Sequence, residues 1–388
     1  MNERVRLGIV GAGGMAQSRS QSLREAIDAG FDLGQLTAIC DTAEERAQST
    51  ADIAEERLGY RPQVFTDHRR MLDEKVVDAV DILTDHKSHH SIAIDALEAG
   101  VDCLVEKPFA ITIRAGLRMI EAAERTGKLL GVAENYRRRV GERSCKYVID
   151  KGLLGEPKIV IRIGIWGTPD SVITPWRHRK LDAGMGWIFD MGVHQADLFR
   201  FYVGDVKQAF GMARYFEPFR YMRDELGIKS EPFENTTEDA SFSLLDFECG
   251  ATGVWVLTTW GHGGENTGLP NTIYGENGCL KDETLFLDGG EKIDVVEYYK
   301  ANAPTELKRS QFPGGLTNPV TLELLEFLRA INGEVELETD GREGLEAMAI
   351  SCAVIESSQE NRPLLIADVI ADKHTIYQDE INDALVIE

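Results

Sequence analysis

Short apolar strands and amphipathic helices alternate throughout the first 135 residues. Strand–helix–strand units of this kind form a parallel, doubly wound sheet with helices on both faces. Right-handed crossovers bring the carboxyl end of every strand to one edge, so a ligand site is expected there. The predicted strands are 5–13, 36–41, 79–85, 102–108 and 129–135, and the predicted helices are 15–30, 43–59, 89–100 and 113–127.

A glycine-rich loop, GAGGMA, joins the first predicted strand to the first predicted helix. Gly11 permits a tight turn, Gly13 lets the backbone approach a pyrophosphate, and Ala16 permits close helix–strand packing. The helix N-terminus offers free N–H groups to phosphates. We therefore predict a Rossmann-type dinucleotide-binding domain. Its phosphate-binding residues would be Gly11, Ala12, Gly13, Gly14, Met15 and Ala16.

Asp41 stands at the end of the second predicted strand. An acidic residue there hydrogen-bonds the ribose hydroxyls of NAD and repels the 2′-phosphate of NADP. We expect NAD as the cofactor, with NADP disfavoured, although Arg46 nearby would soften this preference. A second role for Asp41, as a helix N-cap, is compatible with the first.

The pattern changes after residue 135. A helix and a long alternating strand are predicted within 146–167, and later runs with glycine and asparagine turns predict antiparallel hairpins. We expect an NAD-binding α/β domain over 1–136 and an α+β domain with a large, mostly antiparallel sheet over 137–388. The hairpin runs are 240–248, 251–261 and 271–290, and late helices are predicted at 320–333 and 344–360.

Charge and composition exclude several classes of function. The formal net charge of −23 argues against nucleic acid and against anionic membranes as partners. No run of about 18 apolar residues and no signal peptide is evident, so a cytoplasmic protein is expected. The six cysteines lack the spacing of metal ligands, and we expect reduced thiols and no metal.

Residues 84–108 carry a more specific pattern. Thr84, His89 and Glu106-Lys107-Pro108 match the motif T-P-N-x-x-H…E-K-P, with Asp85 and His86 in place of its proline and asparagine. The chain here resembles the Gfo/Idh/MocA family of NAD(P)-dependent oxidoreductases. The resemblance implies cofactor contacts from Thr84, His86, His89, Glu106 and Lys107.

The stretch GMGWIFDMGVHQAD resembles a second signature of that family, matching at Gly186, Asp190, Gly192, His194 and Asp197. The late helices also look similar, so the resemblance covers essentially the whole chain. It implies a sugar or cyclitol dehydrogenase with a Rossmann domain and a mostly antiparallel C-terminal sheet. A homo-oligomer, dimer or tetramer, assembled through that sheet is also expected.

Three residues are the predicted catalytic set. Asp190 and His194 are four residues apart, which predicts one helical face and one pocket. The ordinary pKa of histidine suits a proton acceptor, and Lys107 would stabilise a developing alkoxide. Other roles stay open: a core histidine for His194, a cap or ion pair for Asp190, and a solvated loop lysine for Lys107.

The substrate side is predicted from aromatic and polar side chains in two segments. Trp176-Arg177-His178 offers an indole platform and hydrogen-bond donors, although the same three residues are also compatible with a solvated basic turn. Asn135 and Tyr136 end the last Rossmann strand and are further candidates. Trp260 and His262 would either close the pocket or cover a subunit interface.

We therefore expect an enzyme that transfers a hydride between NAD and a secondary hydroxyl of a sugar, cyclitol, anhydrosugar or glycoside. A more specific prediction is that the oxidised hydroxyl is the one on C3. The alternative is NAD-dependent glycoside hydrolysis through transient C3 oxidation and elimination. A non-catalytic nucleotide-sensing protein is a third class, and the set Lys107, Asp190 and His194 argues against it.

Overall fold

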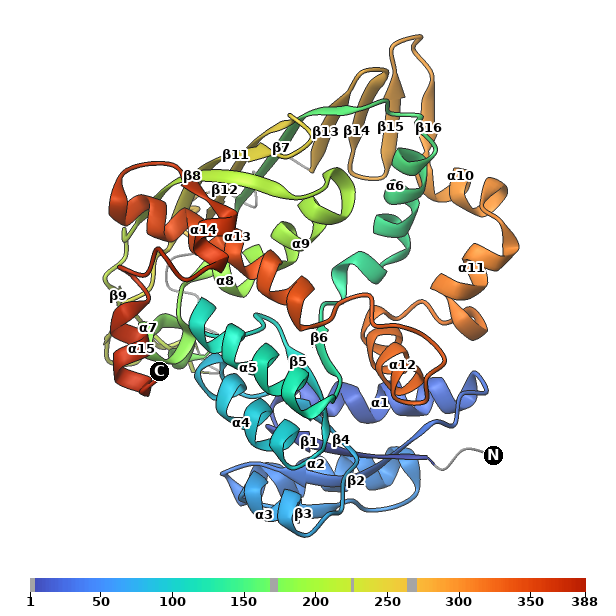
Figure 1. Ribbon diagram of the computed structural model, residues 1–388, viewed down its shortest axis with the longest axis vertical. Helices are drawn as coiled ribbons and strands as arrows, with labels where there is room; N and C mark the ends of the chain where they lie inside the picture. The colour runs from blue at the N-terminus through green and yellow to red at the C-terminus, as the bar shows by residue number, and fades with distance from the viewer. Residues whose placement is uncertain (1–3, 168–173, 225–226, 264–270) are drawn as a thin grey trace. The chain divides into compact units, whose positions relative to one another are not determined.

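The computed structural model describes residues 4–167, 174–224, 227–263 and 271–388. The chain divides into two compact units, each built around its own sheet (Figure 1). The first unit consists of Met1–Ala110, Ala115–Arg139 and Pro304–Gly344, and the second of Ile111–Arg114, Val140–Ala303 and Leu345–Glu388.

The first unit contains the predicted parallel sheet. Its six strands run in the order β3-β2-β1-β4-β5-β6, and every neighbouring pair is parallel. Leu7, Ile9 and Leu36 are among the side chains that form its core, because these strands are buried on both faces. The strands are β1 (Val5–Val10), β2 (Gly34–Cys40), β3 (Gln63–Phe65), β4 (Ala79–Ile82), β5 (Asp102–Glu106) and β6 (Leu130–Ala133).

The helices of this unit follow the predicted alternation, with additions around the short strand β3. Asp67 caps the helix after β3 by accepting a hydrogen bond from the backbone N–H of Arg69. This helix is so short that hydrophobic periodicity does not reveal it in the sequence. The helices are α1 (Gly14–Asp28), α2 (Glu44–Leu58), α3 (His68–Asp73), α4 (His86–Glu98), α5 (Ile113–Thr126, which begins in the second unit), η1 (Tyr136–Arg138), α11 (Thr305–Gln311), η3 (Pro313–Gly315) and α12 (Pro319–Ile331).

The two compact units do not follow the domain boundary expected between residues 136 and 137. That boundary stays a prediction. Helix α12 belongs to the first unit, although it comes late in the sequence. Leu328 on α12 packs so closely against Gly34 on β2 that a Cβ there would lie 2.9 Å from its Cδ1 atom. A sequence boundary places α12 in the second domain because contacts between distant segments are not visible in a linear pattern.

The second unit is built on the predicted, mostly antiparallel sheet. Its nine strands run in the order β16-β15-β14-β13-β7-β12-β11-β8-β17, and within the described part of this sheet only the β7–β12 pair is parallel. The strands are β7 (Pro157–Ile165), β8 (Val206–Arg214), β11 (Ala240–Phe247), β12 (Thr252–Thr258), β13 (Thr272–Gly275), β14 (Gly278–Lys281), β15 (Thr284–Leu287), β16 (Lys292–Asp294) and β17 (Leu364–Leu365), beside a separate pair β9 (Phe219–Arg220) and β10 (Phe233–Glu234).

Helices α6, α9 and α13 lie on one face of this sheet (Figure 1). The contact is dry and aromatic: Trp255 on β12 is fully buried, and its ring centroid lies 5.5 Å from that of Phe199 on α9. The Trp255 indole also donates to Gln195 Oε1 at 2.7 Å. The helices are α6 (Val140–Asp150), η2 (Pro175–His178), α7 (Lys180–Ala183), α8 (Trp187–Asp190), α9 (Gly192–Val203), α10 (Val295–Asn302), α13 (Gly341–Glu360, which begins in the first unit), α14 (Ile366–Ile370) and α15 (Asp379–Leu385).

Among the helices of the described residues, none is both long enough and apolar enough to cross a bilayer.

Candidate active site

The glycine loop of the first unit has the geometry of a phosphate cradle. Gly11 has φ of 99°, and a Cβ at this position would lie 2.7 Å from the backbone oxygen of Leu83. No described atom lies within 4 Å of a Cβ built on Gly13 or Gly14, so space remains in front of the loop. Helix α1 begins there without a side-chain cap from the described residues. Its first N–H groups and this space fit the pyrophosphate of a dinucleotide.

Asp41 is fixed beside this loop. Its Oδ2 atom accepts from the N–H of Ala12 at 2.8 Å, and its Oδ1 atom accepts from the N–H of Ala43 and from Arg46 Nη2 at 2.7 Å. Burial would raise the pKa of Asp41, but these donors outweigh it and hold the pKa below its ordinary value. The N-cap of α2 is Ala43, so Asp41 does not cap that helix. An ionised carboxylate therefore stands at the end of β2.

The predicted residues around Lys107 lie at the ends of β4 and β5. His89 is fully buried, and its Nδ1–H donates to the carbonyl of Pro108 at 3.0 Å. Burial lowers the pKa of His89 to about 4 against the opposing effect of its backbone hydrogen bonds, so the ring is neutral. His86 packs beside it with ring centroids 5.8 Å apart. His89 thus anchors the turn after Lys107, which is half-buried rather than an exposed loop lysine.

The other predicted residues of the first unit lie at the same strand ends or just beyond β6. Thr84 is half-buried and donates to the backbone oxygen of Asp85 at 3.2 Å, while Glu106 is buried at the end of β5. Asn135 and Tyr136 are half-buried after β6, and the guanidinium of Arg139 lies 3.4 Å from the Tyr136 ring centroid.

A buried ion cluster behind the glycine loop was not predicted. Arg19 on α1 lies 2.5 Å from Asp81 on β4 and 2.6 Å from Glu323 on α12, and all three side chains are shielded from solvent. Burial raises the pKa of Asp81 to about 6 and that of Glu323 to about 7, although Arg19 opposes both shifts. The helix that follows the glycine loop is therefore tied to the sheet and to α12 by charge. The only sequence signal was an arginine on an otherwise apolar helix face.

In the second unit, the prediction that Asp190 and His194 share one helix is wrong. Asp190 ends α8, whereas His194 lies in the first turn of α9, and Met191 between them has φ of −107°. Glycines on both sides, Gly186 and Gly192, are packed against neighbouring atoms too closely for a Cβ. A larger residue at either position would therefore require its neighbours to shift. Asp190 and His194 are both buried.

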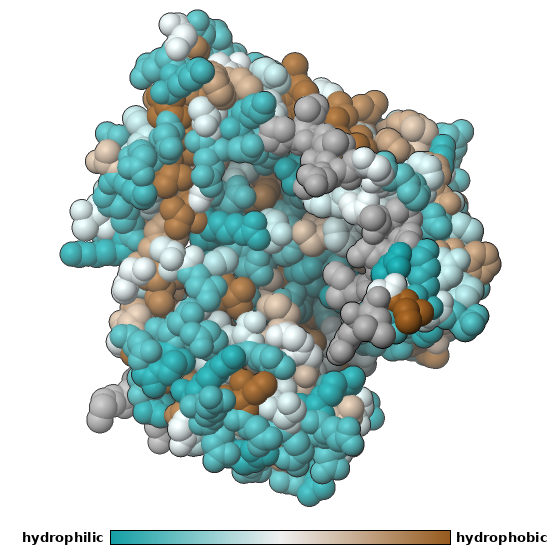
Figure 2. Space-filling view, turned by 180° about the vertical axis from the view of Figure 1, so that it is seen from behind, coloured by the Kyte–Doolittle hydropathy of each residue, from teal (hydrophilic) through white to brown (hydrophobic). Residues whose placement is uncertain are grey.

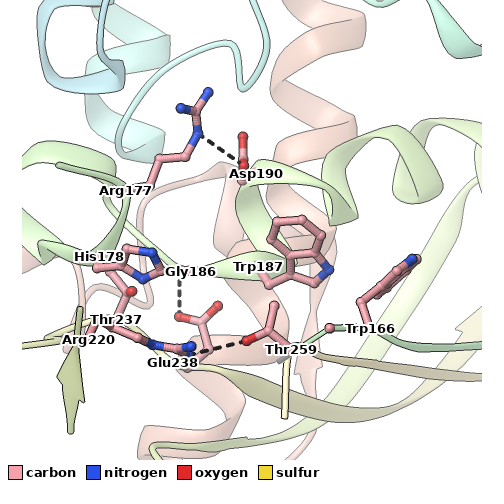
Figure 3. Close-up of a pocket in the computed structure, with 11 residues that line it drawn as sticks. Trp166, Arg177, His178, Gly186, Trp187, Asp190, Arg220, Thr237, Glu238 and Thr259 are labelled. Atoms are coloured by element: carbon pink, nitrogen blue, oxygen red, sulfur yellow. Dashed lines mark hydrogen bonds and ion pairs between the residues drawn. The ribbon is translucent and has the colours of Figure 1, made fainter. Parts of the chain in front are cut away.

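The 3-10 helix η2 carries Trp176, Arg177 and His178 to the region of Asp190. Arg177 Nε lies 3.2 Å from Asp190 Oδ2 (Figure 3). The Arg177 guanidinium also stacks 4.5 Å from the Trp176 ring centroid. Burial, with help from the charges of Arg220 and Arg177, lowers the pKa of His178 to about 4. His178 is thus a neutral side chain, not part of a solvated basic turn.

A cavity of about 180 Å³ lies in this unit, at the ends of β7, β11 and β12 (Figure 3). Arg177, His178 and Asp190 were predicted as site residues, and all three line it. Trp176 and His194 are not among the lining residues. The indoles of Trp166 and Trp187 meet edge to face with centroids 5.8 Å apart. Lining residues that sequence reasoning missed are Trp166, Gly167, Gly186, Trp187, Arg220, Thr237, Glu238 and Thr259.

Glu238 is the most unusual of these missed residues. Its Oε2 atom accepts from the N–H of Gly186 at 2.7 Å, and its Oε1 atom lies 3.4 Å from the N–H of Ile188, at the start of α8. Burial raises the pKa of Glu238 to about 7, against the effect of these backbone donors. In the sequence Glu238 sits in a polar run before a strand, and no spacing rule marks it.

Sequence comparison identifies the family. The profile of the oxidoreductase family with an NAD-binding Rossmann fold matches residues 5–134, and the profile of the family's C-terminal alpha/beta domain matches residues 146–366. The chain belongs to the Gfo/Idh/MocA oxidoreductases.

Relatives of this Gfo/Idh/MocA protein include sugar-acting enzymes. It is 25% identical over 330 residues to 1,5-anhydro-D-fructose reductase of Ensifer adhaerens, covering 84% of this chain and 89% of the relative. It is 26% identical over 290 residues to levoglucosan dehydrogenase of Pseudarthrobacter phenanthrenivorans, covering 72% and 73%. The crystal structure of an oxidoreductase domain protein from Kribbella flavida matches with a TM-score of 0.76 at 26% identity, covering 94% of this chain and 99% of that one.

In this family member the predicted catalytic residues are divided between the units. Lys107 belongs to the first unit, and Asp190 and His194 belong to the second. Within the described ranges, no three histidine, cysteine, aspartate or glutamate side chains are grouped as a metal ion would need. What the described residues provide is a dinucleotide cradle in one unit and a cavity with paired charges and two indoles in the other.

Proposed function

We propose that this protein is an NAD(H)-dependent dehydrogenase that oxidises a secondary hydroxyl of a sugar, cyclitol, anhydrosugar or glycoside. More specifically, we propose that the oxidised hydroxyl is the one on C3 of a pyranoside. The observation that carries the proposal is the cavity, in which two indoles and the Arg177–Asp190 pair face one space. Indoles pack against the C–H face of a sugar ring, and charged pairs orient its hydroxyls. The substrates named for the relatives are also small carbohydrates.

The proposed roles follow from the chemistry of alcohol oxidation. NAD, when bound, accepts the hydride. The family signature, rather than the cavity lining, assigns the hydroxyl proton to His194, since imidazole is the side chain suited to accept a proton in this pH range. Lys107 donates to the same oxygen and stabilises the negative charge that develops on it. Asp190 orients the substrate side of the site, and its own carboxylate is held by Arg177.

We also propose that NAD is preferred over NADP. Asp41 is ionised and already oriented by the N–H groups of Ala12 and Ala43, so it is ready to accept from ribose hydroxyls. A 2′-phosphate would meet this carboxylate in a partly buried position, where like charges repel strongly. Arg46 is paired with Asp41, which reduces its capacity to bind that phosphate.

A substrate panel tests the proposal. The purified protein is incubated with NAD and, in turn, levoglucosan, methyl β-D-glucopyranoside, myo-inositol and D-glucose, and NADH formation is followed by absorbance. We expect NADH from at least one of these sugars. An aryl glucoside with catalytic NAD covers the alternative, because release of the aglycone without stoichiometric NADH would indicate glycoside hydrolysis instead.

We propose that two copies of the chain pair through the open face of the second unit's sheet. Phe242 and Leu244 on β11 point away from α9 and α13 and are 36% and 53% exposed. Met212 on β8 lies opposite Phe242 in register and is also exposed. Figure 2 shows hydrophobic residues at the surface in several separate patches on this side of the molecule. Such a row of apolar side chains is typical of an interface between subunits.

A further inference from the structure

The cavity wall of the second unit contains one hydrogen-bond donor without an acceptor among the described residues and one carboxyl group that can accept a further hydrogen bond. The donor is the indole Nε1 of Trp187, which is shielded from solvent and has no acceptor within hydrogen-bonding distance among those residues. The acceptor is the carboxyl group of Glu238, whose partners there are the backbone N–H groups of Gly186 and Ile188. Figure 3 shows both groups beside the same space.

The charges around this space are otherwise paired. Arg177 is paired with Asp190 at 3.2 Å, and Arg220 lies 3.7 Å from Asp239 and also donates to Thr259. Glu238 has no cationic partner among the described residues. A further negative charge entering the cavity would therefore meet a carboxyl group rather than a cation that is still available.

A sugar fits both groups, because one of its hydroxyls can donate to Glu238 and another of its oxygens can accept from the Trp187 indole. A carboxylate can only accept, so it cannot donate to Glu238, and it would add like charge beside this carboxyl group. The geometry points to Glu238 as the residue that determines substrate specificity: we propose that its carboxyl group binds a hydroxyl of a neutral sugar and rejects the corresponding sugar acid. This inference rests on the proposed function, whose substrate class it narrows.

The position of Glu238 explains why this residue is suited to the role. Its carboxyl group is fixed by the N–H groups at the start of α8, and Ser351 on α13 holds the backbone oxygen of Ile188 at 2.9 Å. Gly186 permits the contact, since a Cβ there would lie 2.0 Å from the backbone oxygen of Glu238. The hydrogen bonds from the start of α8 thus fix the orientation of this carboxyl group before a ligand binds.

The test compares two probes that differ in charge at one carbon. Methyl β-D-glucopyranoside and methyl β-D-glucopyranosiduronate are titrated by calorimetry into the NADH-saturated full-length protein at a pH above the raised pKa of Glu238, where its carboxyl group is ionised. We expect the wild type to bind the neutral probe at least about tenfold more tightly than the acid. Glu238→Gln should reduce that ratio by about tenfold, because the amide adds a donor and removes the charge. Trp187→Phe should weaken binding of the neutral probe by about fivefold or more, since a single buried donor is lost.

A matched control is Glu356→Gln. Glu356 is equally buried in the same unit and also accepts from backbone N–H groups, those of Tyr377 and Gln378, but it does not line the cavity. It should leave the binding ratio unchanged. Equal affinity of the wild type for both probes, or an unchanged ratio in Glu238→Gln, overturns the inference. Because binding is measured without turnover, a wild type that forms no NADH would refute the proposed function while this ratio still decides the role of Glu238.

Discussion

At the scale of single residues, the sequence predicted best those positions where a motif requires one residue type for both its backbone conformation and its chemistry. Gly11 was predicted from a motif, and its positive φ beside the Leu83 carbonyl is what only glycine tolerates. Glu238 could not be predicted, since its burial comes from α8 packing against it from elsewhere in the chain. Periodicity also failed for Asp190 and His194, because α8 ends at Asp190 and a separate helix, α9, begins at Gly192.

The first residue-scale prediction concerns Asp41→Ser. The change removes the carboxylate beside the ribose position and frees Arg46 from its ion pair, so a 2′-phosphate becomes easier to accommodate. We expect the ratio of kcat/KM for NADP to that for NAD to rise by about tenfold. Kinetics with both cofactors on the best substrate measure this ratio, and Asp52→Ser on the exposed face of α2 is the control. An unchanged ratio contradicts the assignment.

The second prediction concerns Lys107→Ala. If Lys107 stabilises charge on the substrate oxygen, its loss should lower kcat by about two orders of magnitude or more, like loss of an oxyanion-hole donor. NADH affinity, measured by fluorescence titration, should stay within about threefold because the glycine loop and Asp41 are intact. Near-normal turnover in this variant would exclude the role.

At the scale of elements, the buried cluster of Arg19, Asp81 and Glu323 connects α1, β4 and α12. We expect Arg19→Met to lower the free energy of unfolding by about 3–5 kcal/mol, because two carboxyl groups then lose their cation in a dry site. Urea denaturation measures the change. Arg24→Met is the control, since the Arg24–Asp28 pair on the same helix is exposed and screened by solvent, so its loss should change the free energy of unfolding far less. Equal effects of the two changes would show that the cluster is not a stabilising element.

The contact between Glu238 and α8 should make stability depend on pH. The pKa of Glu238 is raised to about 7 in the folded protein by burial, so the folded state holds a proton that the unfolded state releases at lower pH. The contribution of this group therefore favours folding below about pH 4.5 and is lost as pH rises to about 7, by up to about 3 kcal/mol. The difference in unfolding free energy between the wild type and Glu238→Gln should change with this sign across that interval. A difference that is independent of pH would contradict the raised pKa.

At the scale of the whole molecule, both sheets follow from local pattern, because period-two alternation and strand–helix alternation are visible in sequence. The short strand β3 and the placement of α12 with the first unit were missed, since each depends on contacts between distant segments.

Assembly belongs to the same scale. Leu244→Asp on the exposed row of β11 should reduce the oligomer to a monomer in sedimentation experiments, whereas Asp246→Asn on the same strand should not. A wild type that is already monomeric would contradict the proposed pairing.

The most direct test of the central claim is NADH formation by the wild type and by His194→Ala on the same panel of neutral sugars. The account predicts stoichiometric NADH with at least one ring alcohol in the wild type, and a loss of about two orders of magnitude or more in the variant, whose proton acceptor is gone. No NADH from any neutral ring alcohol, or undiminished turnover without His194, would contradict it.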